Sequence, residues 1–285
     1  MVSCKPGTSL QRVGASKGSL SDKVSSLLGW DDVFAVKLPE RFSLEIFAGT
    51  ARVTSMLLQH GFQCYPIDIC LSRSHDVLDI GVEHCIINWI MSGRISFIWL
   101  GMPYTTFSQA RKNDGLGPGP LRSSQHVTGL PNLGWRNWQK VQTGNALLRF
   151  TVRIMTMCAQ HSVPFALENP RSSFAWDMPP LQNFIRRYQP DFAYFDFCQY
   201  GEPWRKPTTI IGKFWPVVQL AKTCNPRFGK CSSTLMPHVP LRGVDASQRF
   251  LTLVAQPYPW RLAARVAKLV ATAYGVRDQA TEFEA

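Results

Sequence analysis

The chain has 285 residues, 45% of them hydrophobic and 12% aromatic, which is enough to bury the core of one large domain or two small ones. Its 31 Lys and Arg against 19 Asp and Glu give a formal net charge of +12, which favours a polyanionic partner, nucleic acid first, although a basic soluble protein can have the same charge. The sequence shows no apolar signal segment, no run of about 18 apolar residues and no CxxC pair, which argues against secretion, a membrane span and a small disulfide scaffold.

We therefore expect an intracellular, reducing compartment, which is the nucleus if the source is eukaryotic. Cysteines 64, 70, 85 and 158 lie in apolar surroundings, which predicts reduced core thiols. Residues 1–24 are rich in Ser, Gly and Lys and are expected to form a flexible basic tail, with one domain from residue 25 to 285.

Short apolar strands and helical stretches alternate from Phe42 onward. This alternation predicts an α/β fold in which helices cover a mainly parallel sheet. The predicted strands are 42–47, 62–67, 95–100, 163–167, 194–197 and 208–214, and the predicted helices are 51–60, 82–91 and 139–161.

The first strand, turn, helix and second strand read LEIFAGTARVTSMLLQHGFQCYPIDI. Gly49 lets the backbone pass close to a ligand, and Asp68, 19 positions later, lies where a carboxylate binds both hydroxyls of a ribose. One glycine without GxGxxG suits a nucleoside cofactor that lacks a pyrophosphate, such as S-adenosylmethionine. The alternative is a plain turn at Gly49 and a helix cap at Asp68.

Two further acids follow in the segment HDVLD. Asp76 is our choice for a hydrogen bond from the adenine amino group of such a cofactor. Asp79 suits the N-cap of the next helix equally well.

The segment GMPYTTFS ends the strand 95–100 with a Gly-x-Pro turn, which delivers Tyr104 to the carboxyl edge of the sheet. Residues 111–138 are then rich in Gly, Pro, Arg and Trp and predict a long ordered loop that acts as a lid, or otherwise a disordered insert. Further along, Glu168 closes the strand 163–167 ahead of Asn169–Pro170, either as a functional group or as a helix cap.

Basic and aromatic residues alternate in two segments. Basic groups contact phosphate and aromatic rings stack on unpaired bases, so we expect nucleic acid at this face; a solvated surface with core tryptophans is the alternative. The residues are Arg111, Lys112, Arg122, Trp135, Arg136, Trp138, Lys140 and Trp204–Lys206.

Cys224, Cys231 and His238 lie in a Pro-, Gly- and Ser-rich segment. Thiolate and imidazole are zinc ligands, and a small insert with little core can use such a site. The spacing supplies no fourth ligand, and ordinary thiols with a surface histidine are the alternative.

Taken in order, FAG, PxxxFS and ENP resemble the C5-cytosine methyltransferase family over about residues 42–275. LEIFAGTARV resembles the cofactor motif, HDV the adenine-contacting motif, GMPYTTFS the Pro-Cys motif and ALENP the Glu-Asn-Val motif. The family's Tyr-Gly-x-Pro-Gln-Arg-Arg block is similar to YGEPWRKPTTIIG, and its closing helix is similar to AQPYPWRLAARVAKLVATAYG. The resemblance implies a Rossmann-like class I methyltransferase sheet with helices on both faces, S-adenosylmethionine as cofactor, and DNA as substrate with RNA not excluded.

The resemblance also implies roles for individual residues. Glu45, Phe47 and Pro103 would join Gly49, Asp68 and Asp76 in the cofactor site. Tyr104, Glu168 and Arg205 would line the catalytic site, where the glutamate bonds N3 and the exocyclic amine of cytosine.

Several positions depart from the family pattern. Tyr104 stands where the family has its nucleophilic cysteine, and Trp204, Lys206 and Thr208 replace Gln, Arg and Arg. Residues 213–255 form a small insert in place of a full target-recognition region. Three interpretations remain open: an impaired C5-cytosine methyltransferase, an inactive cofactor- or DNA-binding relative, and an amino-methyltransferase with Tyr104 as stacking platform. In the third, Gly101 lacks the polar side chain that accepts a hydrogen bond from an amine.

Overall fold

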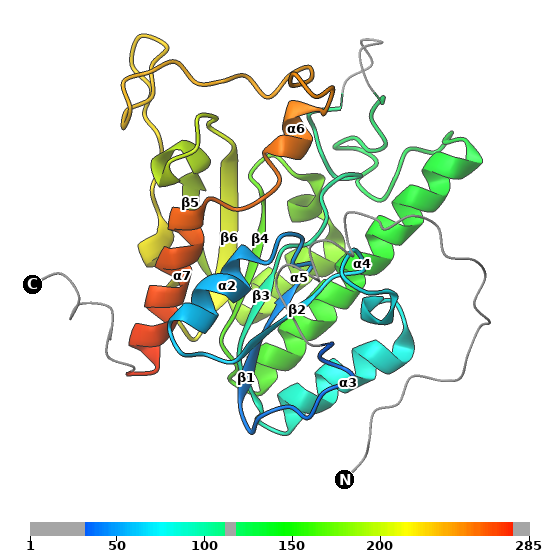
Figure 1. Cartoon of the computed structure of the whole chain (residues 1–285). Helices are drawn as coiled ribbons and strands as arrows, with labels where there is room; N and C mark the ends of the chain where they lie inside the picture. Colours follow the sequence, from blue (N-terminus) through cyan, green and yellow to red (C-terminus); the bar gives the residue numbers. More distant parts are fainter. Residues whose placement is uncertain (1–31, 112–117, 276–285) are drawn as a thin grey trace, which may run out of the picture.

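A computed structural model describes residues 32–111 and 118–275 of the chain (Figure 1). Its centre is a six-stranded sheet in the order β2-β1-β3-β4-β6-β5. The strands are β1 (Phe42–Ile46), β2 (Cys64–Ile67), β3 (Ile95–Leu100), β4 (Phe165–Pro170), β5 (Asp191–Asp196) and β6 (Pro207–Lys213). The tail predicted over residues 1–24 lies outside the described residues.

The first four strands are parallel, and β6 runs antiparallel to both β4 and β5. The strand β1 and its neighbour β3 are buried along their whole length, as is typical of inner strands in a parallel sheet that helices cover on both faces. Because the chain leaves β1 toward β2 on one side and reaches β3 on the other, the strand order reverses at this pair. Open α/β sheets bind their ligands at such a reversal, beyond the carboxyl ends of the strands.

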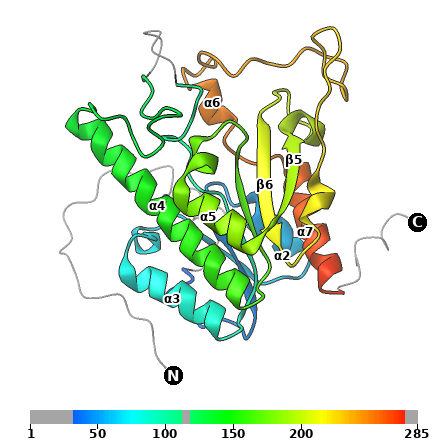
Figure 2. The ribbon, with the colours of Figure 1, turned by 180° about the vertical axis from the view of Figure 1, so that it is seen from behind.

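Helices cover both faces of the sheet (Figures 1 and 2). On one face, α3 (Ile80–Met91), α4 (Trp135–Gln160) and α5 (Pro179–Tyr188) bury side chains in one apolar core. On the other, α2 (Arg52–Gln59) and α7 (Trp260–Ala273) share a second core with Phe97, Phe195 and Trp215. The predicted α/β fold, a Rossmann-like and mainly parallel sheet with helices on both faces, is therefore confirmed.

The segment after β6 contains little regular secondary structure. It passes through a short 3-10 turn, Val217–Leu220, and residues 221–250 then contain only isolated bridges before the short helix α6 (Leu251–Val254). No described helix has both the length and the hydropathy to cross a bilayer.

Three local expectations were wrong. The helix α4 begins at Trp135, not at residue 139, because Gly134 in extended conformation allows the helix to start directly on the Trp-Arg-Asn-Trp segment. Glu168 lies inside β4, which continues to Pro170 by pairing with β6. Cys70 is exposed in the turn after β2, whereas Cys64, Cys85 and Cys158 are buried free thiols as predicted.

Candidate functional site

The turn after β1 has an unusual backbone: Phe47, Gly49 and Ala51 have φ values of 62°, 54° and 50°. This is the left-handed region, which glycine adopts freely and other residues rarely. The turn brings the Gly49 amide to Asp68, where it donates to Oδ2 over 2.9 Å. The two residues expected to hold a nucleoside cofactor are therefore in direct contact.

Asp68 is partly exposed at the end of β2. Its Oδ1 accepts from the Cys70 amide over 2.8 Å, so each oxygen has one backbone partner. A carboxylate has about four acceptor sites, which leaves lone pairs free for two ribose hydroxyls.

His75 connects this carboxylate to the next predicted residue. Its Nδ1 accepts from the Asp68 amide over 3.3 Å, so the proton of a neutral ring lies on Nε2, which is 3.2 Å from Asp32 Oδ1. Asp76 follows directly and is partly exposed, with Oδ1 accepting from the Leu78 amide. Asp79 caps α3 through Gly81 and Val82.

Glu45 lies beneath the turn rather than on its surface. Its Oε2 accepts from the Thr54 amide over 2.6 Å and from the Thr54 hydroxyl over 2.7 Å, while Oε1 is buried with no partner. Burial raises the pKa of this carboxyl to about 7 against the effect of the Thr54 bonds. Phe47, by contrast, is partly exposed and meets the ring of Phe150 edge-on at 6.0 Å.

Tyr104 and Glu168 interact electrostatically across the ends of β3 and β4. Burial, and then the charge of Glu168, raise the pKa of the Tyr104 phenol to about 12. Burial also raises the pKa of Glu168, although the nearby Lys206 charge opposes this. The Nζ of Lys206 lies 5.4 Å from the centre of the Tyr104 ring and donates to the Ala255 carbonyl over 2.9 Å.

A second tyrosine, which was not among the residues predicted from the sequence, also contacts Glu168. Tyr258 precedes α7, and its hydroxyl donates to Glu168 Oε2 over 3.0 Å, while Glu168 Oε1 is buried with no partner. A Cβ at Gly101 would collide with the Tyr258 hydroxyl, so the glycine is what lets Tyr258 reach Glu168. Its sequence signals are its place between two prolines in QPYPW and its position in the segment AQPYPWRLAARVAKLVATAYG, which resembles a family motif.

Arg205 makes its recorded contacts away from Tyr104 and Glu168. Its Nε is 3.4 Å from Asp196 Oδ2 and its Nη2 donates to the Cys224 carbonyl over 3.2 Å. Lys206 is therefore the basic side chain that the block YGEPWRKPTTIIG brings to Glu168.

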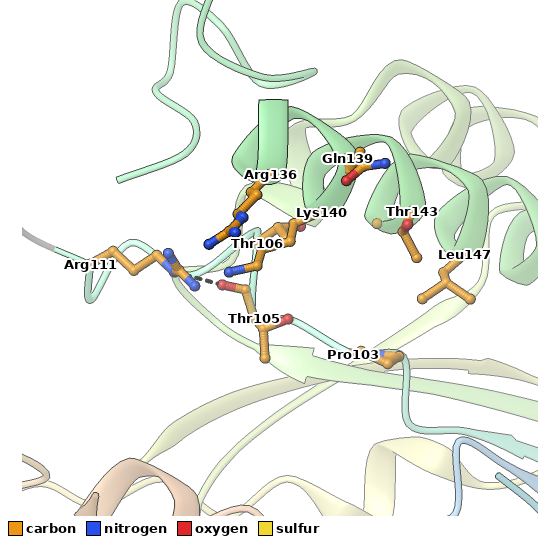
Figure 3. Close-up of a pocket in the computed structure, with 10 residues that line it drawn as sticks. Pro103, Thr105, Thr106, Arg111, Arg136, Gln139, Lys140, Thr143 and Leu147 are labelled. Atoms are coloured by element: carbon orange, nitrogen blue, oxygen red, sulfur yellow. Dashed lines mark hydrogen bonds between the residues drawn. The ribbon is translucent and has the colours of Figure 1, made fainter. Parts of the chain in front are cut away.

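An adjoining cavity of about 810 Å³ opens between the chain after β3 and the first turns of α4. Figure 3 shows Arg136 and Lys140 extending from α4 into the space that the Arg111 guanidinium also reaches, while Pro103 and Leu147 lie at its inner end. Arg111 is held by the Thr105 carbonyl, to which Nε donates over 2.9 Å. Among the residues that the structure describes, the cavity is thus lined by three cations and no acid.

Two tryptophans stand beside this cavity on α4. The rings of Trp135 and Trp138 stack with centroids 5.1 Å apart and planes 13° apart, and they are 67% and 44% exposed. They therefore present a flat aromatic surface to solvent.

Arg122 does not join this face. It is 2% exposed and holds the chain before α4 together, since its guanidinium donates to the Thr106 and Val127 carbonyls and to Asn145. Burial lowers its pKa to about 10. Its expected place on a phosphate-contacting surface was wrong, and Lys112 lies outside the described residues.

The three predicted metal ligands do come together. Cys224, Cys231 and His238 meet at the end of β5, and Cys198 joins them from the turn that follows this strand. Cys198 was not predicted as a ligand, because it lies 26 positions before Cys224, outside the Pro- and Gly-rich segment.

No family model matches the sequence, and no curated protein matches it. Among solved structures, a mutant of DNMT2 from Spodoptera frugiperda is similar at 10% identity with a TM-score of 0.36. The match covers 72% of this chain and 62% of the length of that structure.

Proposed function

We propose that the chain is an S-adenosylmethionine-dependent methyltransferase directed at cytosine in nucleic acid, DNA first, and that Tyr104 impairs its C5 transfer. The observation that carries this proposal is the shared site of Tyr104 and Glu168, beside a contacting Gly49–Asp68 pair at the reversal of the sheet. Cofactor and base would meet at that edge.

The cofactor half rests on Asp68, Asp76 and Phe47. Asp68 and Asp76 are partly exposed carboxylates, and His75 connects them because it accepts from the Asp68 amide and directly precedes Asp76. Both carboxylates have lone pairs left for ribose hydroxyls and an adenine amine. The partly exposed ring of Phe47 offers an apolar wall beside them.

The proposed binding of the target cytosine depends on Glu168. Attack at C6 of cytosine builds negative charge at N3, and a buried carboxyl whose pKa is raised binds a proton more readily than a free carboxyl, which suits it to donate a hydrogen bond there. The Tyr258 hydroxyl donates a hydrogen bond to Glu168 Oε2, while Glu168 Oε1 has no partner. That oxygen is the one we assign to the base.

The nucleophile is the weak element of this site. A phenol whose pKa is raised to about 12 stays protonated at neutral pH, whereas the family's cysteine ionises far more easily. We therefore expect little or no C5 transfer by the wild-type chain.

The approach of nucleic acid is supported by the cavity and the tryptophan pair. Arg111, Arg136 and Lys140 would neutralise phosphates, and the exposed rings would stack on unpaired bases. The amino-methyltransferase alternative is disfavoured, because Gly101 has no polar side chain and the Tyr258 hydroxyl occupies the space beside it.

Calorimetry with S-adenosylmethionine tests the cofactor half. Wild type should bind, and Asp68→Ala should lose about tenfold or more in affinity, because charged hydrogen bonds contribute about 1.5–3 kcal/mol. Asp191→Ala, which removes an exposed carboxylate from the edge strand β5, is the matched control and should bind like wild type. Absence of binding heat in folded wild type at high micromolar cofactor would refute the proposal.

A further inference from the structure

We propose that Cys198, Cys224, Cys231 and His238 form a tetrahedral zinc site that fastens residues 221–250 to the end of β5. One ligand atom from each residue lies within 4.8 Å of all the others. Three thiolates and one imidazole are a common donor set of structural zinc sites, in which all four positions are taken by protein.

Two of the distances in the cluster match those of a zinc-filled site. Zinc binds sulfur at about 2.3 Å and imidazole nitrogen at about 2.0–2.1 Å, so tetrahedral geometry places two sulfurs about 3.8 Å apart and a sulfur and a nitrogen about 3.6 Å apart. Cys224 Sγ lies 3.8 Å from Cys231 Sγ and 3.6 Å from His238 Nε2. A disulfide requires about 2.05 Å between its sulfurs, so these thiols are not bonded to each other.

The surroundings suit thiolates. Cys198, Cys224 and Cys231 are 2%, 4% and 2% exposed and form a separate small core. Both the amide and the hydroxyl of Ser232 donate to Cys224 Sγ over 3.5 Å, and Gln199 Nε2 lies 3.6 Å and 3.7 Å from the other two sulfurs. Such outer donors orient and stabilise metal ligands.

The segment has little else to hold it together. Phe228, Leu235 and Met236 are 101%, 69% and 66% exposed, and residues 221–250 contain neither helix nor sheet strand. Small units that bury so little apolar surface commonly depend on a metal or on disulfides.

The site also connects the segment to the proposed active centre. The Cys224 amide donates to Asp196 Oδ2 over 2.6 Å, and the same carboxylate meets Arg205, the neighbour of Lys206. The amide of Val239 donates to the Pro203 carbonyl over 2.9 Å. A bound metal would thus hold the block that presents Lys206 to Glu168.

Metal content of the full chain, purified under reducing conditions without chelator, tests the proposal. Wild type should carry about one zinc per chain, and Cys198→Ser and Cys231→Ser should lose most of it. Cys70→Ser, which changes an exposed cysteine outside the cluster, is the matched control and should keep its zinc.

Two measurements keep the test independent of folding failure. His238→Cys should retain zinc, since four thiolates are an equally good tetrahedral set, whereas His238→Ala should lose it. Chelator-treated wild type reloaded with Co²⁺ should show the intense visible bands of a tetrahedral cobalt thiolate. A folded wild type that is free of zinc and gives no such bands, or one with a Cys224–Cys231 disulfide in peptide mapping, overturns the proposal. Neither outcome bears on cofactor binding at Asp68, which is measured separately.

Discussion

At the scale of single residues, Tyr104 decides what the proposed centre can do. Its phenol lies where Glu168 and Lys206 converge, so the groups that would polarise a base are present while the nucleophile is not. Under the proposed function, the side chain that follows Pro103 therefore separates an active enzyme from a binding protein of the same fold.

Replacing this one side chain should restore chemistry. Tyr104→Cys should transfer labelled methyl groups from S-adenosylmethionine to C5 of cytosine in DNA and form a covalent adduct with 5-fluorocytosine, while wild type shows little or none. Restoration should be partial, because Thr208 stands where the family has an arginine. Tyr104→Phe is the control and should stay inactive at C5. Strong C5 transfer by wild type would show that Tyr104 does not disable the site, whereas cofactor binding without transfer in both proteins would favour an inactive relative.

Glu45 makes folding stability depend on pH. Its folded-state pKa of about 7 lies above the value of about 4.5 expected in an unfolded chain, so its contribution is fully present below pH 4.5 and is lost as pH rises through 7. The Glu45→Gln variant cannot ionise there. Between pH 4.5 and pH 8 the stability of wild type relative to this variant should fall by up to about 3 kcal/mol in urea unfolding. An unchanged difference across this range would contradict the buried, weakly ionised carboxyl.

At the scale of elements, α4 carries most of the proposed nucleic-acid face. Arg136 and Lys140 are four positions apart and so share one side of the helix, with Thr143 and Leu147 continuing that line into the cavity. The stacked rings of Trp135 and Trp138 lie at the same end of this helix. A single rigid element thus positions both the cations and the rings.

Removing one ring should weaken binding of single-stranded DNA. Trp135→Ala should reduce affinity between about fivefold and a hundredfold in a fluorescence anisotropy titration, since each stacked base contributes about 1–3 kcal/mol. Its melting temperature should stay near that of wild type because the ring is largely exposed. Tyr194→Ala, on the edge strand β5, is the matched control for loss of an exposed aromatic ring. Equal losses in both variants would remove α4 from the interface.

Elements whose signals are local could be predicted from the sequence. The strand β1, its turn and α2 follow from an apolar run, Gly49 and a helical stretch that ends at Gly61. The place of β6 could not be predicted in this way, because its antiparallel pairing with β4 depends on contacts between residues about forty positions apart. The same holds for the site: Gly49 and Asp68 are joined by one turn-helix-strand unit, whereas Tyr258 meets Glu168 across 90 positions and Cys198 meets its partners across a whole strand.

At the scale of the whole molecule, features far apart in the chain gather at one end. The chain after β3, the start of α4 and residues 221–250 all lie at the upper end of the molecule in Figure 1. The excess of positive charge in the sequence has a local counterpart there in the cations around the cavity. Charge of one sign around a concave site concentrates anionic ligands at it.

The late position of α7 in the chain also has a consequence for biosynthesis. Its side chains cover Val53, Leu57 and Phe97 on one face of the sheet, and Tyr258, just before it, closes over Glu168. A ribosome delivers a protein from its N-terminus, so a nascent chain that has reached residue 254 has made every strand of the sheet but not α7, one of the two helices that cover this face. Until α7 emerges, the nascent protein exposes the apolar side chains that α7 covers in the folded chain.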